Sequence, residues 1–169
     1  MEVKNFNNIR IFTDGSCTGN GKKSAQAGIG VYFPNNEFDN ISEKFTQEPI
    51  TNQRAELYAI YEALKLITKN ATFKKLTIYT DSLYSIKSLT EWIKKWEINN
   101  WKTTGNKPVL NLDIIRPIYS ILNDYKNKIK FEHVRSHTGE STFEARGNEM
   151  VDRLACAGTL KNSQTKIII

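Results

Sequence analysis

The sequence has few of the features that mark secreted, membrane or repetitive proteins. It contains only two cysteines, Cys17 and Cys156, which argues against a disulfide framework and favours a reducing compartment. No apolar run approaches the roughly 20 residues that cross a bilayer, and there is no evident repeat, low-complexity segment or signal peptide. We therefore expect an intracellular protein, without distinguishing cytoplasm from nucleus, and no membrane partner.

The composition is that of a basic globular domain. Lysine and arginine number 24 against 18 acidic residues, so the formal net charge is +6. The length of 169 residues is sufficient for one domain with a substantial core, and nothing in the pattern implies a protein partner, so we expect a monomer. The positive charge favours a polyanionic partner such as nucleic acid.

Strand and helix patterns alternate along the chain. Residues 9–14 have the character of a buried strand, and strands at 27–33 and 37–46 follow turn-forming segments, which indicates an antiparallel meander. A helix and then a strand come next, so this fourth strand should lie parallel to a neighbour and carry Asp81 at its carboxyl end. The elements expected after the meander are helix 52–70, the fourth strand at 74–80, helix 82–98, basic loop 99–108, helix 112–125, strand 130–134 and helix 148–157, the last ending near Gly158.

Four acidic residues stand in separately recognisable settings. They are Asp14 in T-D-G-S-C, Glu56 in T-N-Q-R-A-E, Asp81 in Y-T-D-S and Asp152 in G-N-E-M-V-D. Each alone has an ordinary explanation, since Asp14 could begin a turn and Asp81 could cap a helix. Packed a few Å apart, however, they could not all stay ionised without a divalent cation. If the fold brings them together, the pattern predicts metal-dependent phosphoryl transfer.

Together with H-T-G at 137–139, these motifs resemble type 1 ribonuclease H in their order and approximate spacing. The resemblance runs from about Ile9 to Gly158. It implies an α/β, RNase H-like fold, in which a five-stranded mixed sheet of three antiparallel strands plus parallel strands is flanked by helices and carries a basic protrusion. It also implies an N-terminal extension at 1–8, a catalytic domain at 9–160 and a C-terminal tail at 161–169.

The resemblance implies an endoribonuclease that hydrolyses the RNA strand of RNA–DNA hybrids and leaves 5′-phosphate and 3′-hydroxyl ends. Two Mg²⁺ ions would serve the reaction, with Mn²⁺ as an alternative. By matching positions, Asp14 would bridge both ions and Asp152 would hold the ion that activates water, while Glu56 and Asp81 would hold the other. Hard carboxylate ligands favour Mg²⁺ over Zn²⁺, and such a pair of ions activates the nucleophile and stabilises the leaving oxygen.

His137, in V-R-S-H-T-G, matches a family histidine on a mobile loop that assists proton movement or the release of metal and product. Without the resemblance, a lone histidine in such a loop would be taken for a surface residue. His137 and Asp152 are 15 residues apart, which is longer than the family pattern, and S-T-F-E-A has the place of the extra sequence. We expect a longer or displaced loop.

Four residues match positions at which the family contacts RNA in the minor groove, where donors and acceptors read the 2′-hydroxyl. They are Cys17, Asn20, Asn52 and Gln53. Two of them also have structural explanations, since Asn52 could only cap a helix and Cys17 could be a small buried side chain.

The other strand of a hybrid would meet an aromatic and basic stretch. Trp92 and Trp96 are four residues apart on one helix face, and a lysine-rich loop follows them, so aromatic surface and positive charge are interleaved. Pro49 stands where an arginine often completes the family's DNA-phosphate pocket, so Arg54 or a lysine would have to substitute. The positions that match DNA contacts are Thr51, Tyr84, Trp92, Thr104 and Asn111.

Two other functions stay open. One is a transposase- or integrase-like nuclease domain of the same superfamily, which would cut DNA. The other is a non-catalytic hybrid-binding protein, which would be expected to lack at least one of the four carboxylates.

Overall fold

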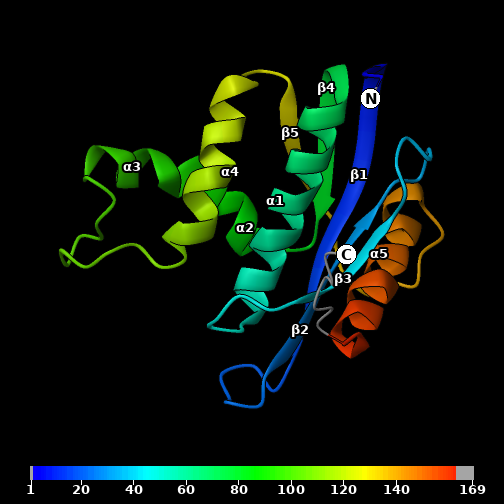
Figure 1. Cartoon of the computed structure of the whole chain (residues 1–169). Coiled ribbons are helices and arrows are strands. Elements are labelled where there is room, and N and C mark those ends of the chain that lie inside the picture. The colour runs from blue at the N-terminus through cyan, green and yellow to red at the C-terminus, as the bar shows by residue number, and fades with distance from the viewer. Residues whose placement is uncertain (1, 163–169) are drawn as a thin grey trace, which may run out of the picture.

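The computed structural model of the protein describes residues 2–162. Its core is a five-stranded mixed sheet in the order β3-β2-β1-β4-β5, in which β1, β2 and β3 are antiparallel and β4 and β5 run parallel to β1. This confirms the predicted fold class. The elements shown in Figure 1 are β1 (Lys4–Thr18), β2 (Gln26–Tyr32), β3 (Ile41–Phe45), α1 (Asn52–Asn70), β4 (Ala71–Thr80), α2 (Leu83–Lys87), η1 (Ser88–Trp92), α3 (Ile93–Ile98), α4 (Leu112–Asp124), β5 (Ile129–His133) and α5 (Phe143–Leu160).

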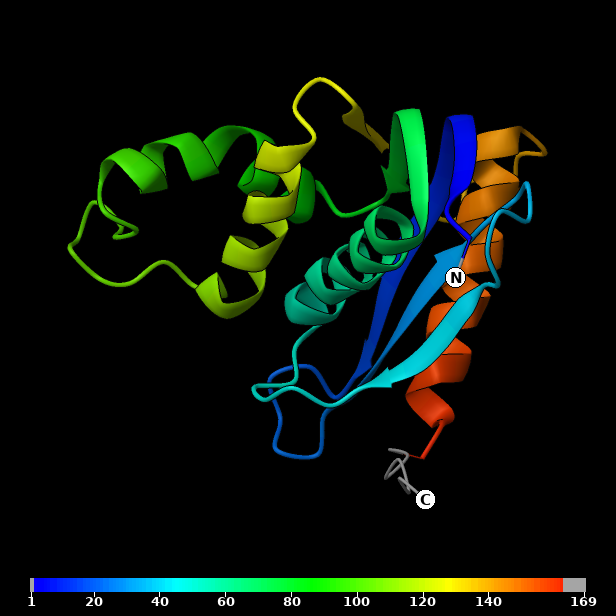
Figure 2. The same ribbon diagram turned by 45° about the horizontal axis from the view of Figure 1, so that its top comes forward.

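Helices cover both faces of the sheet, with α1 and α4 on one face and α5 on the other (Figures 1 and 2). Because successive strand residues point to opposite faces, β1 contributes to a core on each side. Ile9 and Ile11 belong to the main core with α1, whereas Phe12 packs with Val151 of α5 in a smaller core. The middle of β1, from Ile11 to Gly15, is thus buried from both sides.

Helix α1 has the predicted bounds because its sequence contains both the cap and the apolar face. The hydroxyl of Thr51 accepts a hydrogen bond from the backbone N–H of Arg54 at 3.2 Å, which is the geometry of an N-cap. The apolar positions at helical spacing are all buried against the sheet, namely Leu57, Ile60, Leu64 and Ile67. This packing turns the first turns of α1, and with them Glu56, toward the end of β1.

Three strands differ from the sequence expectation by more than one residue, and one of them, β4, begins at Ala71 instead of residue 74. β1 begins at Lys4, whose register partner is Ala71 of β4, so residues 4–8, which we expected to precede the catalytic domain, belong to the sheet. β3 is shorter than 37–46, because Asn40 accepts a hydrogen bond from the N–H of Phe33 at 2.8 Å and holds the preceding residues in a turn. Residues 163–169, most of the predicted tail, lie outside the described residues.

Helix α5 is longer than the predicted 148–157 at both ends. Thr142 caps it by accepting a hydrogen bond from the N–H of Ala145 at 3.1 Å, five residues earlier than expected. Gly158 does not end the helix as predicted. A Cβ on Gly158 would lie 2.4 Å from the carbonyl oxygen of Glu43, so this glycine lets α5 pack closely on β3.

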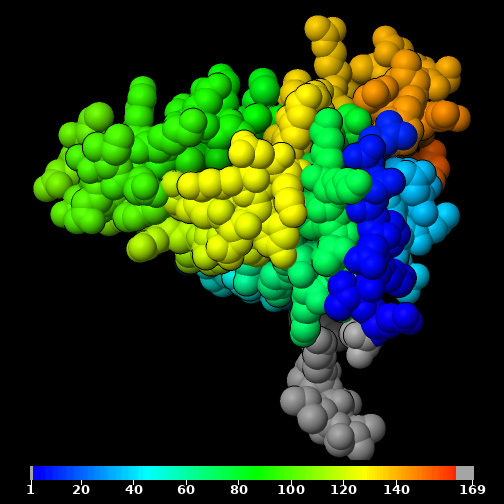
Figure 3. All heavy atoms as spheres, turned by 90° about the horizontal axis from the view of Figure 1, so that it is seen from above, coloured from blue at the N-terminus to red at the C-terminus, as the bar shows by residue number. Residues whose placement is uncertain are grey.

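The segment predicted as one helix at 82–98 has a π-helical turn, η1, between α2 and α3. Such a turn changes the direction in which the following side chains point. Residues 93–111, which we call the basic arm, project away from the sheet (Figures 2 and 3). Helix α4 follows within a residue of its predicted bounds, with Pro117 inside it. None of the described helices combines the length and apolar character that a membrane crossing needs.

Candidate active site

Three of the predicted carboxylates meet at one end of the sheet. Asp14 lies in β1 and Asp81 directly follows the adjacent parallel strand β4, so both are at the same edge, and Glu56 reaches them from α1. One ligand oxygen from each of the three lies within 4.8 Å of the others. The sheet topology therefore produces the cluster that the sequence predicted.

The glycine of T-D-G-S-C explains why α1 can come so close. A Cβ on Gly15 would lie 2.4 Å from the backbone nitrogen of Glu56 and 2.9 Å from the Cβ of Ala55. Real side chains do not tolerate such contacts, so only glycine allows the start of α1 to rest on β1 at this point. Gly15 thus brings Glu56 to Asp14.

Asp152 approaches the cluster from the other face of the sheet, on α5. Its charge raises the pKa of both Asp14 and Asp81, although burial is the larger cause for each. One helical turn later, the thiol of Cys156 lies 4.0 Å from Oδ1 of Asp152 and 3.6 Å from the hydroxyl of Ser16. Asp14 is thus close enough to Glu56, Asp81 and Asp152 for all three to affect its pKa.

The electrostatics of the cluster call for a cation. Burial, with the charge of Asp81 as the next cause, raises the pKa of Asp14 from 3.8 to about 8. Burial and the charge of Asp14 raise the pKa of Glu56 well above its usual range. Oε2 of Glu56 is buried and has no hydrogen-bond partner among residues 2–162. An unsatisfied carboxylate oxygen among hard oxygen donors fits a divalent cation such as Mg²⁺.

His137 lies beside this cluster even though its distance from Asp152 in sequence is long. With Asp152, Asn148 and Arg135, it lines a hollow of about 250 Å³ next to the carboxylates. His137 is exposed and has a left-handed backbone with φ of 54°. The structure therefore puts the histidine and the last acid at one site.

Part of the extra sequence S-T-F-E-A lies in the first turn of α5. Phe143, in the first turn of α5, packs on Phe12 and Tyr79 at ring-centroid distances of 5.4 and 5.8 Å. The guanidinium of Arg10 lies 3.9 Å from the centre of the Phe143 ring. Residues 143–145 of S-T-F-E-A thus form a helical turn that is anchored on the sheet, and the longer or displaced loop stays a prediction.

The comparison with known families agrees with this geometry. The RNase H family model matches residues 7–159. The chain belongs to the RNase H family. It is 43% identical over 148 residues to ribonuclease H of Schizosaccharomyces pombe, covering 88% of this chain and 52% of that protein. It is 36% identical to ribonuclease H of Orientia tsutsugamushi, covering 90% of this chain and 83% of that protein.

A solved RNase H domain has a similar fold. The solution structure of the PFV RNase H domain is 25% identical, with a TM-score of 0.69, and the match covers 89% of this chain and 93% of that domain. The chain spans about half the length of several curated relatives, including the S. pombe enzyme. Similarity to part of those longer proteins shows the family of this chain.

Three of the four predicted RNA-contact residues are joined by hydrogen bonds. Oδ1 of Asn20 accepts from the backbone N–H of Asn52 at 3.1 Å, and the thiol of Cys17 lies 3.9 Å from the same oxygen. Thr51, and not Asn52, supplies the helix cap. The side chain of Asn52 is therefore not needed for capping. Gln53, next in sequence, is exposed on the same first turn.

The predicted DNA-contact residues are only partly brought together. Asn111 donates to the hydroxyl of Tyr84 at 2.9 Å, and the ring of Tyr84 lies 6.1 Å from that of Trp92. Thr51 lies at the start of α1, three residues before Arg54, which reaches Asn111. Thr104 lies exposed in the basic arm, and its role stays a prediction.

Arg54 is not the free cation that we expected in place of the missing arginine at Pro49. Both terminal nitrogens of its guanidinium donate to the carboxylate of Asp113 at 2.7 Å, and the side chain is only 3% exposed. Its charge is thus neutralised by a partner 59 residues away. Arg54 instead fixes Asn111, whose Oδ1 lies 3.4 Å from the guanidinium.

Sequence reasoning missed Asn148. Its amide nitrogen lies 3.5 Å from Oδ2 of Asp81, and this contact opposes the effect of burial on the pKa of Asp81. Its carbonyl oxygen is buried without a partner in the described part of the chain. The signal was present, because Asn148 is one helical turn before Asp152 in G-N-E-M-V-D and so faces the same side.

Proposed function

We propose that this chain is a Mg²⁺-dependent endoribonuclease that hydrolyses the RNA strand of RNA–DNA hybrids, with Mn²⁺ as an alternative ion and 5′-phosphate and 3′-hydroxyl products. Membership of the RNase H family and similarity to proteins named ribonuclease H support it. The observation that carries the proposal is the buried cluster of Asp14, Glu56 and Asp81, in which an oxygen of Glu56 has no partner among the described residues.

We assign the metal sites to the four carboxylates. Asp14, whose pKa responds to Glu56, Asp81 and Asp152, suits the bridging position; we assign Asp152 to the ion that activates water and Glu56 with Asp81 to the other. When bound, two divalent cations would supply an activated water and stabilise the leaving 3′-oxygen. To His137, which shares a hollow with Asp152, we assign the uptake or release of a proton on the water side.

Substrate reading is assigned to two neighbouring surfaces. The RNA surface consists of Cys17, Asn20, Asn52 and Gln53, at the end of β1 and the start of α1, close to Glu56. The DNA surface consists of Thr51, Tyr84, Trp92, Thr104 and Asn111, continuing into the basic arm. Because Thr51 directly precedes Asn52, the two surfaces meet at the first turn of α1. A hybrid that lies across this turn would present its RNA strand to the carboxylates.

Cleavage of matched substrates tests the proposal. We expect Mg²⁺-dependent cleavage of the RNA strand of a labelled hybrid, no cleavage of duplex RNA or duplex DNA, and none in chelator. Affinity for hybrid should fall with salt by about one log unit per log of salt for each neutralised phosphate. Cleavage of duplex DNA would favour a transposase- or integrase-like nuclease, and binding of hybrid without cleavage would favour a non-catalytic protein.

A further inference from the structure

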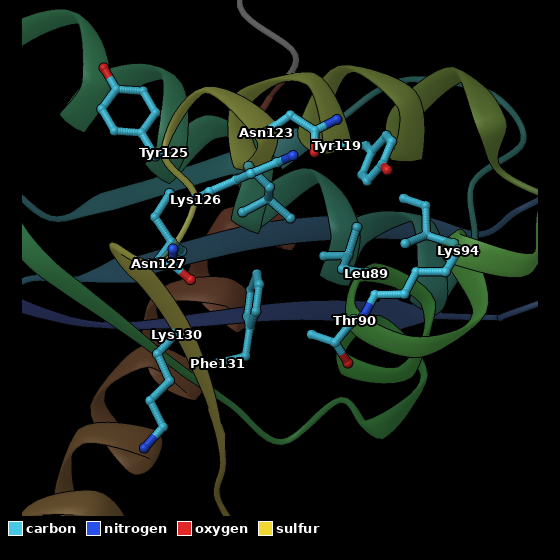
Figure 4. Close-up of a pocket in the computed structure, with 13 residues that line it drawn as sticks. Leu89, Thr90, Lys94, Tyr119, Asn123, Tyr125, Lys126, Asn127, Lys130 and Phe131 are labelled. Atoms are coloured by element: carbon cyan, nitrogen blue, oxygen red, sulfur yellow. The ribbon is translucent and has the colours of Figure 1, made fainter. Parts of the chain in front are cut away.

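A second concave site lies beside β5, an edge strand of the sheet. It is a cavity of about 540 Å³ between η1 with α3, the second half of α4, and β5 (Figure 4). Ile129 and Phe131 of β5 line it and pair with Leu76 and Ile78 of β4, upstream of Asp81. A volume of this size is in the range of small-ligand sites. We call this cavity the β5 pocket.

The floor of the β5 pocket is apolar. Leu89 and Ile93 are 4% and 1% exposed and belong to the main core, and the half-buried Leu122 and Phe131 pack against that core. In Figure 4 the ring of Phe131 and the side chain of Leu89 lie at the centre of the cavity. A floor made of core side chains keeps its shape, and it offers a flat apolar group a surface to lie on.

The rim of the pocket is positively charged. Three lysines line it and no acidic residue does. Lys130 forms an ion pair with Glu132 at 2.6 Å, and its amine points away from the other labelled side chains in Figure 4. Lys94 and Lys126 have no ion pair within residues 2–162. These two amines are therefore available to an anion that enters the pocket.

The pocket opens on a different side of the η1–α3 segment from Trp92 of the proposed DNA surface, although Lys94 belongs to the basic arm. Thr90 and Lys94 face the cavity from one side of the η1–α3 segment. Trp92 lies two residues after Thr90 in the sequence, and Trp96 lies two residues after Lys94. Two residues correspond to about 200° around a helix, so the tryptophans point to roughly the other side. Glu97, close to the hydroxyl of Tyr119, raises the pKa of Tyr119, and Tyr119 itself lines the pocket.

We propose that the β5 pocket binds a small amphipathic anion, with a flat aromatic body on the floor formed by Leu89, Ile93 and Phe131, and one phosphate or carboxylate at Lys94 and Lys126. The apolar floor would accept a neutral ring, but the unpaired lysines favour one that carries negative charge. The charges alone would hold an anion weakly, because exposed ion pairs contribute little. Both parts of the ligand are therefore needed.

The test compares probes that carry one or both parts. We would titrate 1-naphthyl phosphate, the neutral 2-naphthalenemethanol, inorganic phosphate and adenosine 5′-monophosphate into the full chain, following backbone amide shifts by NMR. We expect 1-naphthyl phosphate to shift the amides of Thr90, Asn123 and Phe131 and to bind at least about tenfold more tightly than either one-part probe. Equal or tighter binding of adenosine 5′-monophosphate would identify a nucleotide as the source of the anion, and weaker binding a non-nucleotide.

Variants locate the site and separate it from the carboxylates. We expect the double variant K94A/K126A to weaken 1-naphthyl phosphate about tenfold, K130A to leave its affinity unchanged, and D14N to bind it like the parent chain. The D14N measurement needs no cleavage, so it stands whether or not the proposed nuclease activity is found. The proposal is overturned if inorganic phosphate binds as tightly, if no pocket amide shifts, or if RNA–DNA hybrid displaces the probe from D14N, which would assign the pocket to the nucleic-acid path.

Discussion

The carboxylate cluster and the loop that carries His137 are neighbours, but they are built in opposite ways. Asp14 and Glu56 are 3% and 5% exposed and stand on β1 and α1, which share the main core. His137 is exposed, in a segment fixed at one end where the N–H of Val134 donates to the carbonyl of Thr80 and at the other by Phe143. The cluster is thus held rigidly and the histidine is held only through its anchors.

This difference shows how the two parts can divide one task. A buried carboxylate without a partner costs several kcal/mol, so the core must hold the cluster in place until a cation binds. An exposed loop costs little to rearrange, which suits a group that moves protons or lets products leave. Changes in the cluster should therefore affect activity and stability in opposite directions, whereas changes in the loop should affect turnover alone.

The largest effect is expected from Asp14→Asn. The amide cannot bridge two cations, so cleavage of hybrid should fall at least about 1,000-fold while hybrid binding is retained. Since Asp14 no longer brings a buried charge, the metal-free protein should become about 1–3 kcal/mol more stable at pH 8. Single-turnover cleavage, hybrid binding and urea unfolding measure the three quantities. Asp39→Asn, at an exposed carboxylate in the β2–β3 turn, is the matched control and should change none of them.

The metal-free protein should lose stability as the pH rises. The pKa of Asp14 is raised from 3.8 to about 8, so the folded state binds the proton more tightly than the unfolded state does. This contribution is fully present below about pH 4 and is lost as the pH rises toward 8, with a slope of up to about 1.4 kcal/mol per pH unit. Glu56, whose pKa is also raised, acts in the same direction.

Added Mg²⁺ should oppose this loss and stabilise the fold more at pH 8 than at pH 6, because the cation competes with protons for the same oxygens. Urea unfolding at pH 5, 6, 7 and 8, in chelator and in Mg²⁺, measures both trends. D14N should show a shallower pH dependence in chelator. Stability that is independent of pH in chelator, or an effect of Mg²⁺ that is equal at pH 6 and pH 8, would contradict the assignment of the cluster as a cation site.

His137→Ala is expected to slow single-turnover cleavage by about 10–100-fold, the range for loss of a general acid or base, and to change hybrid affinity less than about twofold. Its urea unfolding should match the parent chain, because the side chain is exposed. Arg135→Ala, in the same loop, is a control for the loss of a cation near the substrate. Unchanged cleavage together with weaker binding would assign His137 to substrate binding and remove the contrast with the cluster.

The sequence was most informative where local pattern and burial coincide. Helix α1 was predicted closely, with Thr51 or Asn52 as its cap and an end near Asn70, because the cap and the spacing of its apolar residues are local signals, and the acids were recognisable because each stands in a motif that resembles type 1 ribonuclease H. The partner of Arg54 was not predictable, because Asp113 lies 59 residues away and the pair forms only when α1 and α4 pack. The early start of α5 was missed because Phe143 is held by β1 and β4.

Phe143→Ala tests whether the first turn of α5, which the sequence did not predict, positions the loop that carries His137. We expect its effect on cleavage to be the smallest of those predicted here. The ring is half-buried, so its loss should destabilise the fold by about 1–3 kcal/mol and slow cleavage only several-fold. If Phe143 acts by positioning the loop, the same substitution in the His137→Ala background should not slow cleavage further. Leu160→Ala, at the exposed far end of α5, is the control and should leave both quantities unchanged. Equal slowing in both backgrounds would mean that the anchor of α5 serves Asp152 and the rigid cluster, and not the adjustable loop.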